Sequence, residues 1–327
     1  MPKSSNKTSA FGQHRDAQKT VAREFIKRWE FFYGKERAQE LFHQLRLEDP
    51  RIIAPNTLLI NLHDLQRRLE RQGFKFSTLP EYTALGVQYE PFNLVATPEY
   101  LGGWFSIQAL SSLIPPRVLP LDNTATIADL AAAPGIKTSL LAMEMKNHGT
   151  ILALEKSKKR LSALKATLAR MGVHNTFVIN LDSTKFAQLH ISVSGVLLDA
   201  PCSGTGLKLT KDKRLAPRIL SDISRLASIQ SQLLENAWQQ LQKGGTLVYS
   251  TCSLEPEEGE VLIDTFVSQR KPEEVELLPI PIQVGWPGNE THWYEPFSSP
   301  SLEHTRRIFP DIGIDGFFIA MMRKLVR

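Results

Sequence analysis

Residues 126–138 read TIADLAAAPGIKT, a short apolar strand followed by a turn of small residues that leads into a helix. Small side chains let a backbone approach a ligand closely, and the helix N-terminus offers free N–H donors to a carboxylate or phosphate. Ile136 stands where a Walker A loop needs its second glycine, and a G-x-G-x-x-G fingerprint is absent. The segment therefore predicts a ligand loop that differs from the two common nucleotide-binding loops.

Short apolar strands alternate with helices around and after this loop. We predict strands at 126–130, 150–154, 176–180, 195–198 and 246–250, and helices at 137–146, 156–171 and 220–242. This alternation is typical of an α/β fold with a doubly wound, Rossmann-like parallel sheet, whose ligands bind at the carboxyl ends of the strands. With strand order 3-2-1-4-5, the first strand is central and the fourth and fifth strands are neighbours.

One part of the dinucleotide pattern survives in the sequence. Glu155 ends the second strand about 20 residues after Gly135, where a carboxylate binds ribose hydroxyls. A ligand with a ribose but no pyrophosphate fits both observations, and S-adenosylmethionine is such a ligand. Its amino-acid part would lie on the loop 132–138, its ribose on Glu155 and its adenine near Asp182. The alternative for Glu155 is a solvated residue that the helix dipole stabilises.

The two cysteines of the chain, Cys202 and Cys252, each follow one of the two neighbouring strands. Residues 1–7 are polar and no apolar run approaches the roughly 18 residues of a membrane span, so we expect a cytoplasmic protein with free thiols and no membrane partner. A cysteine is most often a small buried hydrophobe. Because adjacent strands lie about 4.8 Å apart, however, both thiols should open onto one cleft.

The N-terminal third of the chain has a different character. Helical spacing predicts two amphipathic helices between residues 16 and 46, and a small α/β module follows at 50–95. Of the net charge of +5, residues 1–95 carry +4, which indicates a polyanionic partner such as RNA, although such charges are often just solvated. We therefore predict an N-terminal RNA-binding region at 1–95 and a catalytic domain at 96–327.

The combination of motifs resembles the Sun/nucleolar-protein family of S-adenosylmethionine-dependent RNA cytosine-5 methyltransferases. Beside the loop at 129–138, the matching segments are 96–108 (ATPEYLGGWFSIQ), 181–186 (LDSTKF), 199–206 (DAPCSGTG) and 249–258 (YSTCSLEPEE). The resemblance covers about residues 96–327, and the module at 50–95 more loosely. The sequence departs from the family pattern at Ile136, where a second glycine is usual, and at Gly259, where an asparagine is usual.

The resemblance assigns a role to each matching position. It implies that Cys252 is the nucleophile and that Cys202 assists product release. It also implies that Asp199 holds the target cytosine and that Lys137 lies near the reacting groups, where its charge would favour the Cys252 thiolate. The implied cofactor contacts are Ala132, Ala133, Pro134, Gly135, Lys137, Glu155, Arg160, Asp182 and Asp199.

This interpretation predicts methyl transfer from S-adenosylmethionine to carbon 5 of a cytosine in tRNA or rRNA, through a covalent cysteine adduct. We expect a monomer without a metal site, cytoplasmic, or nucleolar if the source is eukaryotic. Lys208, Lys211, Lys213 and Arg214 are expected to contact RNA phosphates, and the alternative for this short basic stretch is a solvated loop.

Three other functions compete with this one. A DNA cytosine methyltransferase would use the Pro-Cys thiol as nucleophile and leave Cys252 without a role. A non-catalytic RNA-binding or ribosome-assembly factor would keep the fold without turnover. A nicotinamide dehydrogenase is disfavoured by the missing glycine fingerprint.

Overall fold

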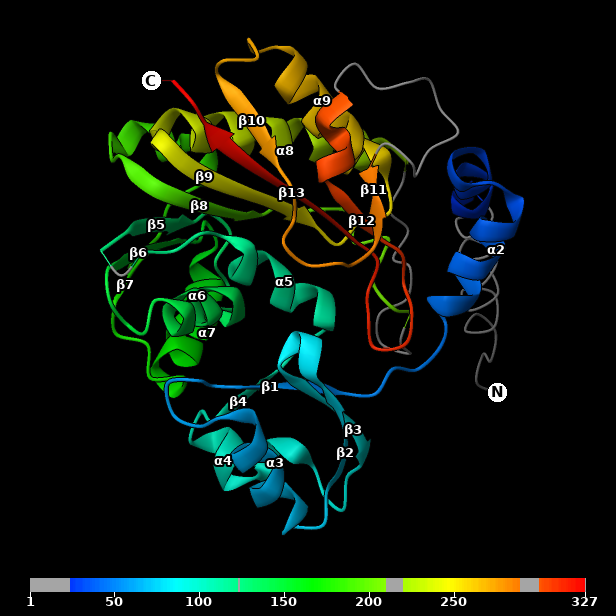
Figure 1. Ribbon diagram of the computed structural model, residues 1–327, viewed down its shortest axis with the longest axis vertical. Helices are drawn as coiled ribbons and strands as arrows, with labels where there is room; N and C mark the ends of the chain where they lie inside the picture. The colour runs from blue at the N-terminus through cyan, green and yellow to red at the C-terminus, as the bar shows by residue number, and fades with distance from the viewer. Residues whose placement is uncertain (1–23, 123, 210–219, 289–299, 327) are drawn as a thin grey trace, which may run out of the picture.

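A mixed sheet of nine strands forms the body of the molecule (Figure 1). The computed structural model describes residues 24–122, 124–209, 220–288 and 300–326. The parallel strands are β5 (Thr126–Asp129), β6 (Thr150–Leu154), β7 (Thr176–Ile179), β8 (Val193–Asp199) and β9 (Leu241–Thr251). They lie in the order β7-β6-β5-β8-β9. The doubly wound fold class and the 3-2-1-4-5 order predicted from the sequence are thus confirmed.

Four further strands, which the sequence analysis did not predict, extend this sheet beyond β9. They are β10 (Val275–Leu278), β11 (Trp286–Pro287), β12 (Arg306–Ile308) and β13 (Phe317–Lys324). β13 pairs antiparallel with β9, and its other edge pairs with β12 and β10 in turn. β13 is buried along nearly its whole length and so lacks the alternation of a half-exposed strand, while β11 and β12 are too short to show a period.

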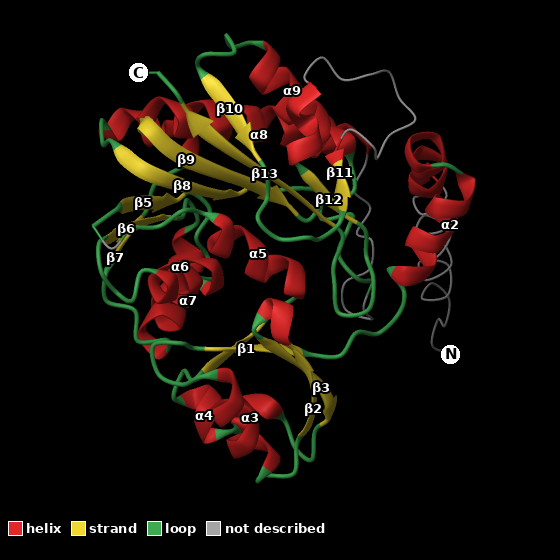
Figure 2. Cartoon of the chain, viewed as in Figure 1, coloured by secondary structure: helices red, strands yellow, loops and turns green. Residues whose placement is uncertain are grey.

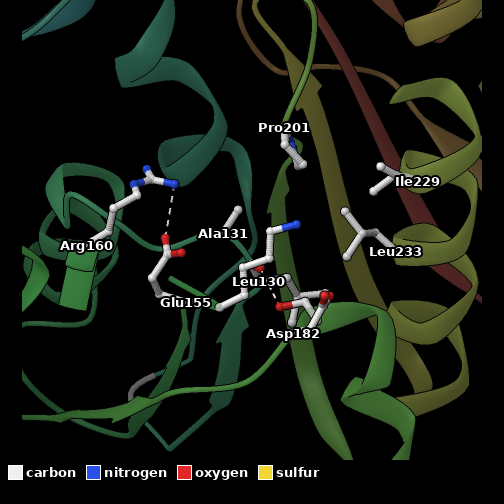
Figure 3. Close-up of a pocket in the computed structure, with 10 residues that line it drawn as sticks. Leu130, Ala131, Glu155, Arg160, Asp182, Pro201, Ile229 and Leu233 are labelled. Carbon is white, nitrogen blue, oxygen red and sulfur yellow. Dashed lines mark hydrogen bonds and ion pairs between the residues drawn. The ribbon is translucent and has the colours of Figure 1, made fainter. Parts of the chain in front are cut away.

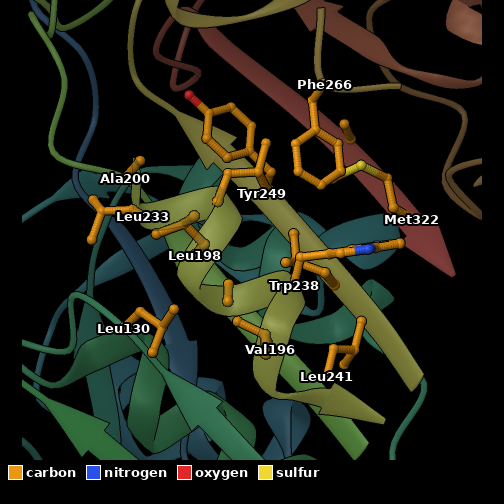
Figure 4. Packing of buried hydrophobic residues seen from close by; sticks show 14 of the residues in the cluster. Leu130, Val196, Leu198, Ala200, Leu233, Trp238, Leu241, Tyr249, Phe266 and Met322 are labelled. Carbon is orange, nitrogen blue, oxygen red and sulfur yellow. The ribbon is translucent and has the colours of Figure 1, made fainter. Parts of the chain in front are cut away.

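Helices cover both faces of the large sheet (Figure 2). They are α5 (Leu110–Val118), α6 (Ile136–Glu144), α7 (Lys158–Arg170), α8 (Leu220–Gln240) and α9 (Glu260–Ser268). Figure 4 shows the core beneath α8 and α9, where Trp238 and Phe266 pack with Leu198 and Tyr249 of the sheet. The strand neighbours Leu197 and Val248 belong to the opposite core, beneath α5 and α6, as the two-residue period of a strand requires.

A second, smaller sheet lies at the other end of the molecule (Figure 1). It has the order β2-β3-β1-β4, with every neighbouring pair antiparallel. Its elements are β1 (Ile52–Pro55), α3 (Leu62–Glu70), β2 (Lys75–Leu79), β3 (Ala84–Tyr89), α4 (Pro98–Leu101) and β4 (Phe105–Ile107). β4 follows residue 95, where the sequence placed a domain boundary, and that division remains a prediction.

Two helices precede the small sheet, at residues 24–33 and at α2 (Lys35–Gln44). The break between them at Gly34 (φ 80°) agrees with the sequence prediction, and residues 16–23 of the predicted first helix lie outside the described part. Trp29 and Leu41 pack against Leu254, in the loop that follows β9. The helices therefore join the large sheet at its ligand edge. Within the described ranges, no helix is both long and apolar enough to cross a membrane.

The loop after Cys202 runs directly against the backbone near the C-terminal strand. The Gly206 N–H donates to the Cys252 carbonyl at 3.1 Å, and the Gly316 N–H donates to the Gly206 carbonyl at 2.8 Å. A Cβ atom on Gly206 would lie 2.4 Å from the Gly316 carbonyl oxygen, so only glycine fits without a shift of the backbone.

We expect Gly206→Ala to lower the free energy of unfolding by about 1–3 kcal/mol, because the added methyl group forces two backbones apart. Urea denaturation followed by circular dichroism measures the change. Ser162→Ala, at an exposed position on α7, is the control and should change the value by less than about 0.5 kcal/mol. A Gly206→Ala midpoint equal to that of the wild type would contradict the close approach.

Candidate active site

The two thiols lie next to each other at the carboxyl edge of the sheet. β8 and β9 pair in parallel with Asp199 opposite Ser250, so the turns that follow them begin side by side. Cys202 and Cys252 occupy those turns, and their Sγ atoms are 3.1 Å apart. Both cysteines are free. The predicted convergence of the two thiols on one place is confirmed.

A partly buried ion pair lies beside the thiols. Lys137, in the first turn of α6, places its Nζ 2.8 Å from Oδ2 of Asp199, the last residue of β8. Ser250 donates a hydrogen bond to the other oxygen of Asp199 at 2.8 Å. Burial by itself lowers the pKa of Lys137, but the charges of Asp199 and Cys252 outweigh it and raise that pKa overall. Lys137 is therefore a permanent cation next to Cys252.

The environment of the Cys202 thiol makes it a weaker acid than an ordinary cysteine. The hydrogen bond with Cys252, followed by burial, raises the pKa of the Cys202 thiol well above its usual value. The nearby charges of Glu258 and Asp199 act in the same direction. Two thiols in contact do not both ionise, so the Cys202 thiol keeps its proton in this arrangement.

A pocket opens at the same carboxyl edge of the sheet (Figure 3). Its lining comes from the segments that follow four parallel strands, from α7 and from α8: Leu130, Ala131, Glu155, Lys156, Arg160, Asp182, Ser183, Pro201, Ile229 and Leu233. Pro201, Ile229 and Leu233 form an apolar wall, and Glu155 and Asp182 face it with carboxylates. An apolar slot with a few placed polar groups is the usual form of a small-ligand site.

The two carboxylates of the pocket are held in fixed positions. Glu155 accepts a hydrogen bond from the Ser157 backbone at 2.7 Å and lies 3.2 Å from Arg160. Burial raises the pKa of Asp182, but hydrogen bonds from Thr184 and nearby lysines outweigh it and lower that pKa overall. Asp182 is therefore an ionised acceptor at neutral pH.

The predicted cofactor residues fall into two groups. Glu155, Arg160 and Asp182 line the pocket. Six others do not line it, namely Ala132, Ala133, Pro134, Gly135, Lys137 and Asp199. The side chains of Ala132 and Ala133 are buried against α7, and Gly135 (φ 105°) starts α6 where a Cβ atom would meet Leu164 at 3.0 Å. Cofactor contacts from these six residues remain predictions.

The sequence analysis missed two kinds of site residue. Ser250 bonds to Asp199, and the register of two parallel strands, which local sequence does not contain, brings the two together. Ile229 and Leu233 come from α8, which the sequence analysis predicted as a helix without assigning its apolar residues to a pocket wall. The predicted strand order, combined with the amphipathic face of α8, would have identified Ile229 and Leu233.

One predicted RNA contact is wrong. Lys208 is buried, and its Nζ donates to the backbone carbonyls of Gln44 at 3.1 Å and Asp311 at 2.7 Å, and lies 3.2 Å from Asp49. These bonds satisfy the ammonium group inside the protein, so Lys208 is a structural tie rather than a phosphate ligand. The other residues of that basic stretch, Lys211, Lys213 and Arg214, lie outside the described residues.

The two departures from the expected motif have local settings. Ile136 is half-buried at the first position of α6. At Gly259, a Cβ atom would lie 2.6 Å from the Arg307 guanidinium and 3.0 Å from the Phe318 ring. Glycine therefore stands at 259 because a neighbouring arginine and an aromatic ring fill the space. Among the described residues, no cluster of three His, Cys, Asp or Glu side chains could hold a metal ion.

Comparisons with known proteins match most of the chain. A family model described as 16S rRNA methyltransferase RsmB/F matches residues 116–323. The chain is 36% identical over 298 residues to the 26S rRNA (cytosine-C(5))-methyltransferase nsun-1 of Caenorhabditis elegans, covering 88% of this chain and 44% of that protein. It is 35% identical over 283 residues to ribosomal RNA small subunit methyltransferase F of Escherichia coli O7:K1, covering 84% and 57%. The chain thus spans about half the length of these two relatives.

Solved structures match nearly the whole chain. A methyltransferase homolog protein from Pyrococcus horikoshii has a TM-score of 0.82 at 37% identity, over 95% of this chain and 98% of that one. NSun6 from Pyrococcus horikoshii, solved with SFG, has a TM-score of 0.82 at 24% identity, over 93% and 98%. The second similarity supports the fold alone.

Asp129, at the end of β5, connects the ligand loop to α6. It is buried, and the Thr138 hydroxyl donates to its carboxyl at 2.7 Å. Burial raises the pKa of Asp129 from 3.8 to about 6. Between these two pH values the Asp129 carboxyl group is ionised in the unfolded chain but still protonated in the folded protein. The contribution of this group to stability therefore falls as the pH rises from about 4 to 6.

We expect Asp129→Asn to abolish this fall in stability with rising pH. Relative to the variant, the wild type should become less stable by up to about 3 kcal/mol between pH 4 and pH 6 and stay level above that range. Urea unfolding of both proteins across this range measures the difference. Asp122→Asn, at an exposed loop position, is the control. A difference between wild type and Asp129→Asn that does not vary with pH would contradict the prediction.

Proposed function

Because the chain belongs to the 16S rRNA methyltransferase RsmB/F family, we propose that it transfers a methyl group from S-adenosylmethionine to carbon 5 of a cytosine in ribosomal RNA. The observation that carries this proposal is the contact between two free thiols, 3.1 Å apart, beside a lysine–aspartate pair. Its relatives named above are ribosomal RNA methyltransferases, which favours that substrate over tRNA.

The pocket residues fit the proposed cofactor. The Glu155 carboxylate is buried at the end of β6, where its free acceptor capacity suits ribose hydroxyls. The apolar wall of Ile229, Leu233 and Pro201 suits the flat adenine ring, with Asp182 at its polar edge. When bound, S-adenosylmethionine supplies an electrophilic methyl group.

The chemistry explains why a thiol is needed. Carbon 5 of cytosine is a poor nucleophile, and addition of the Cys252 thiolate to carbon 6 places an electron pair at carbon 5. The Asp199 carboxylate would accept a hydrogen bond from the exocyclic amine of cytosine. The adjacent Lys137 ammonium would offset the negative charge that develops on the ring.

Cys202 would act in the second half of the reaction. After methyl transfer the carbon 5 proton must leave, its electron pair re-forms the ring double bond, and the bond between Cys252 and carbon 6 breaks. The main influence that raises the Cys202 pKa is its hydrogen bond with Cys252. Once Cys252 is bonded to carbon 6 that influence is gone, so Cys202 ionises more readily and becomes a base beside the adduct.

The first test is a covalent trap. Cys202→Ala should accumulate a protein–RNA adduct that survives a denaturing gel when it is mixed with unmodified ribosomal RNA and S-adenosylmethionine, because release is blocked. The adduct should disappear in Cys202→Ala/Cys252→Ala. An adduct that survives in the double variant would refute Cys252 as nucleophile. The absence of any adduct together with the absence of methyl transfer by the wild type would favour the non-catalytic RNA-binding factor.

A second test concerns the cofactor. Glu155→Gln should raise the dissociation constant of S-adenosylmethionine about tenfold, because the loss of a charged acceptor for hydroxyl groups costs about 1.4 kcal/mol. Isothermal titration calorimetry without RNA measures the constant. Glu144→Gln, a partly exposed carboxylate that pairs with Arg117 at the far end of α6, is the control. Equal affinity in wild type and Glu155→Gln would exclude the proposed ribose contact.

A further inference from the structure

The residue that follows each cysteine is a buried serine. Ser203 follows Cys202 and Ser253 follows Cys252, and both serine side chains are almost completely inaccessible. Their hydroxyl oxygens are 2.9 Å apart. The two cysteine turns are thus in contact twice, once through the thiols and once, on the buried side, through the serines.

Both serines bond to the carboxyl group of Glu258. The Ser203 N–H donates to Oε1 at 2.9 Å, the Ser253 hydroxyl donates to Oε2 at 2.5 Å, and the Ser203 hydroxyl also donates to Oε2. Glu258 lies in the short 3₁₀ turn Pro256–Glu258, and its side chain is fully buried. One carboxyl group therefore holds the residue after each thiol.

The residues that precede the two cysteines are also linked to Glu258 by hydrogen bonds. The Thr251 hydroxyl donates to the Glu258 carbonyl at 3.2 Å. Gln230 of α8 donates both to the Pro201 carbonyl and to Oε1 of Glu258, each at 3.0 Å. Glu258 is consequently connected to both sides of Cys252, and, directly or through Gln230, to both sides of Cys202.

The buried carboxyl group of Glu258 obtains its hydrogen-bond partners from the candidate site itself. Burying a carboxylate costs several kcal/mol unless a cation or several hydrogen bonds compensate, and apolar replacements are often at least as stable. Within the part of the chain that the structure describes, no Lys, Arg or His side chain pairs with Glu258. The compensation comes instead from donors in the two cysteine turns and from Gln230.

We propose that Glu258 is a positioning residue that sets the distance and orientation of the two thiols by holding the serine after each of them. Its catalytic consequence rests on the proposed two-thiol reaction, whereas its geometric effect does not. In agreement with this role, the charge of Glu258 adds to the hydrogen bond and the burial that raise the Cys202 pKa.

The geometric effect is measurable without RNA. The effective concentration of the thiol pair, obtained from the equilibrium between the dithiol and the Cys202–Cys252 disulfide in glutathione buffers, reports how firmly the thiols are held together. We expect Glu258→Gln to lower it tenfold or more, because the neutral amide cannot accept from all the donors. An effective concentration that is unchanged or higher would overturn the proposal.

Two further variants make this result specific. Glu257→Gln changes the adjacent carboxylate, which pairs with Arg28 and contacts neither serine, and should leave the effective concentration unchanged. Ser253→Ala removes one hydroxyl without burying new bulk, and it replaces Glu258→Gln if that variant fails to fold by circular dichroism. A wild-type value in Ser253→Ala would then refute the role of the serine–glutamate link.

Methyl-transfer kinetics test the consequence. In Glu258→Gln we expect kcat to fall about 100-fold, as for a misplacement of reacting groups by about 1 Å. The KM for S-adenosylmethionine should stay the same, because Glu258 does not line the pocket. A wild-type kcat in this variant would overturn the proposal. If the effective concentration falls but even the wild type methylates no RNA, the proposed function fails and the positioning role stands.

Discussion

The parallel pairing of β8 with β9 is the constraint on which the candidate site depends. The register sets Asp199 opposite Ser250, and the two chains leave the sheet at the same level. Because neighbouring strands are about 4.8 Å apart, the side chains of the following turns meet without any further adjustment of the backbone. The contact between Cys202 and Cys252 and the bond from Ser250 to Asp199 are both consequences of this single register.

The turn after β9 is supported from a distant part of the chain. Arg28 and Trp29, on the helix at residues 24–33, bond to the buried Glu255 at 2.5 and 3.0 Å, and the Tyr33 hydroxyl bonds to the Leu254 carbonyl. Removal of one partner of a buried carboxylate lowers the stability of the fold far more than removal of one partner of an exposed ion pair. The helix at residues 24–33 is thus bound to the turn that follows Cys252.

The sequence predicted those features that depend on local pattern and on general rules of α/β sheets. Strand order and the meeting of Cys202 with Cys252 follow from short apolar runs and the order of a doubly wound sheet, and both are confirmed. The buried position of Lys208 was not predictable in this way. Its partners Gln44 and Asp311 lie 164 and 103 residues away, and no local pattern distinguishes a lysine that bonds to carbonyls from one that faces solvent. The edge strands β10 and β12 were not predicted for a related reason, since tertiary contacts set their pairing with β13.

The pocket and the thiols are separated by one peptide unit. Pro201 forms part of the apolar wall of the pocket, and the next residue, Cys202, touches Cys252. On the other side, Leu130 and Ala131 line the pocket, while Lys137, in the first turn of the helix that follows this loop, reaches Asp199. The same segments would thus enclose a methyl donor and carry the side chains that would bind the methyl acceptor. Proximity of this kind reduces the entropic cost of bringing two substrates together. It requires that both turns be rigid, which a buried carboxyl group bonded to each of them provides.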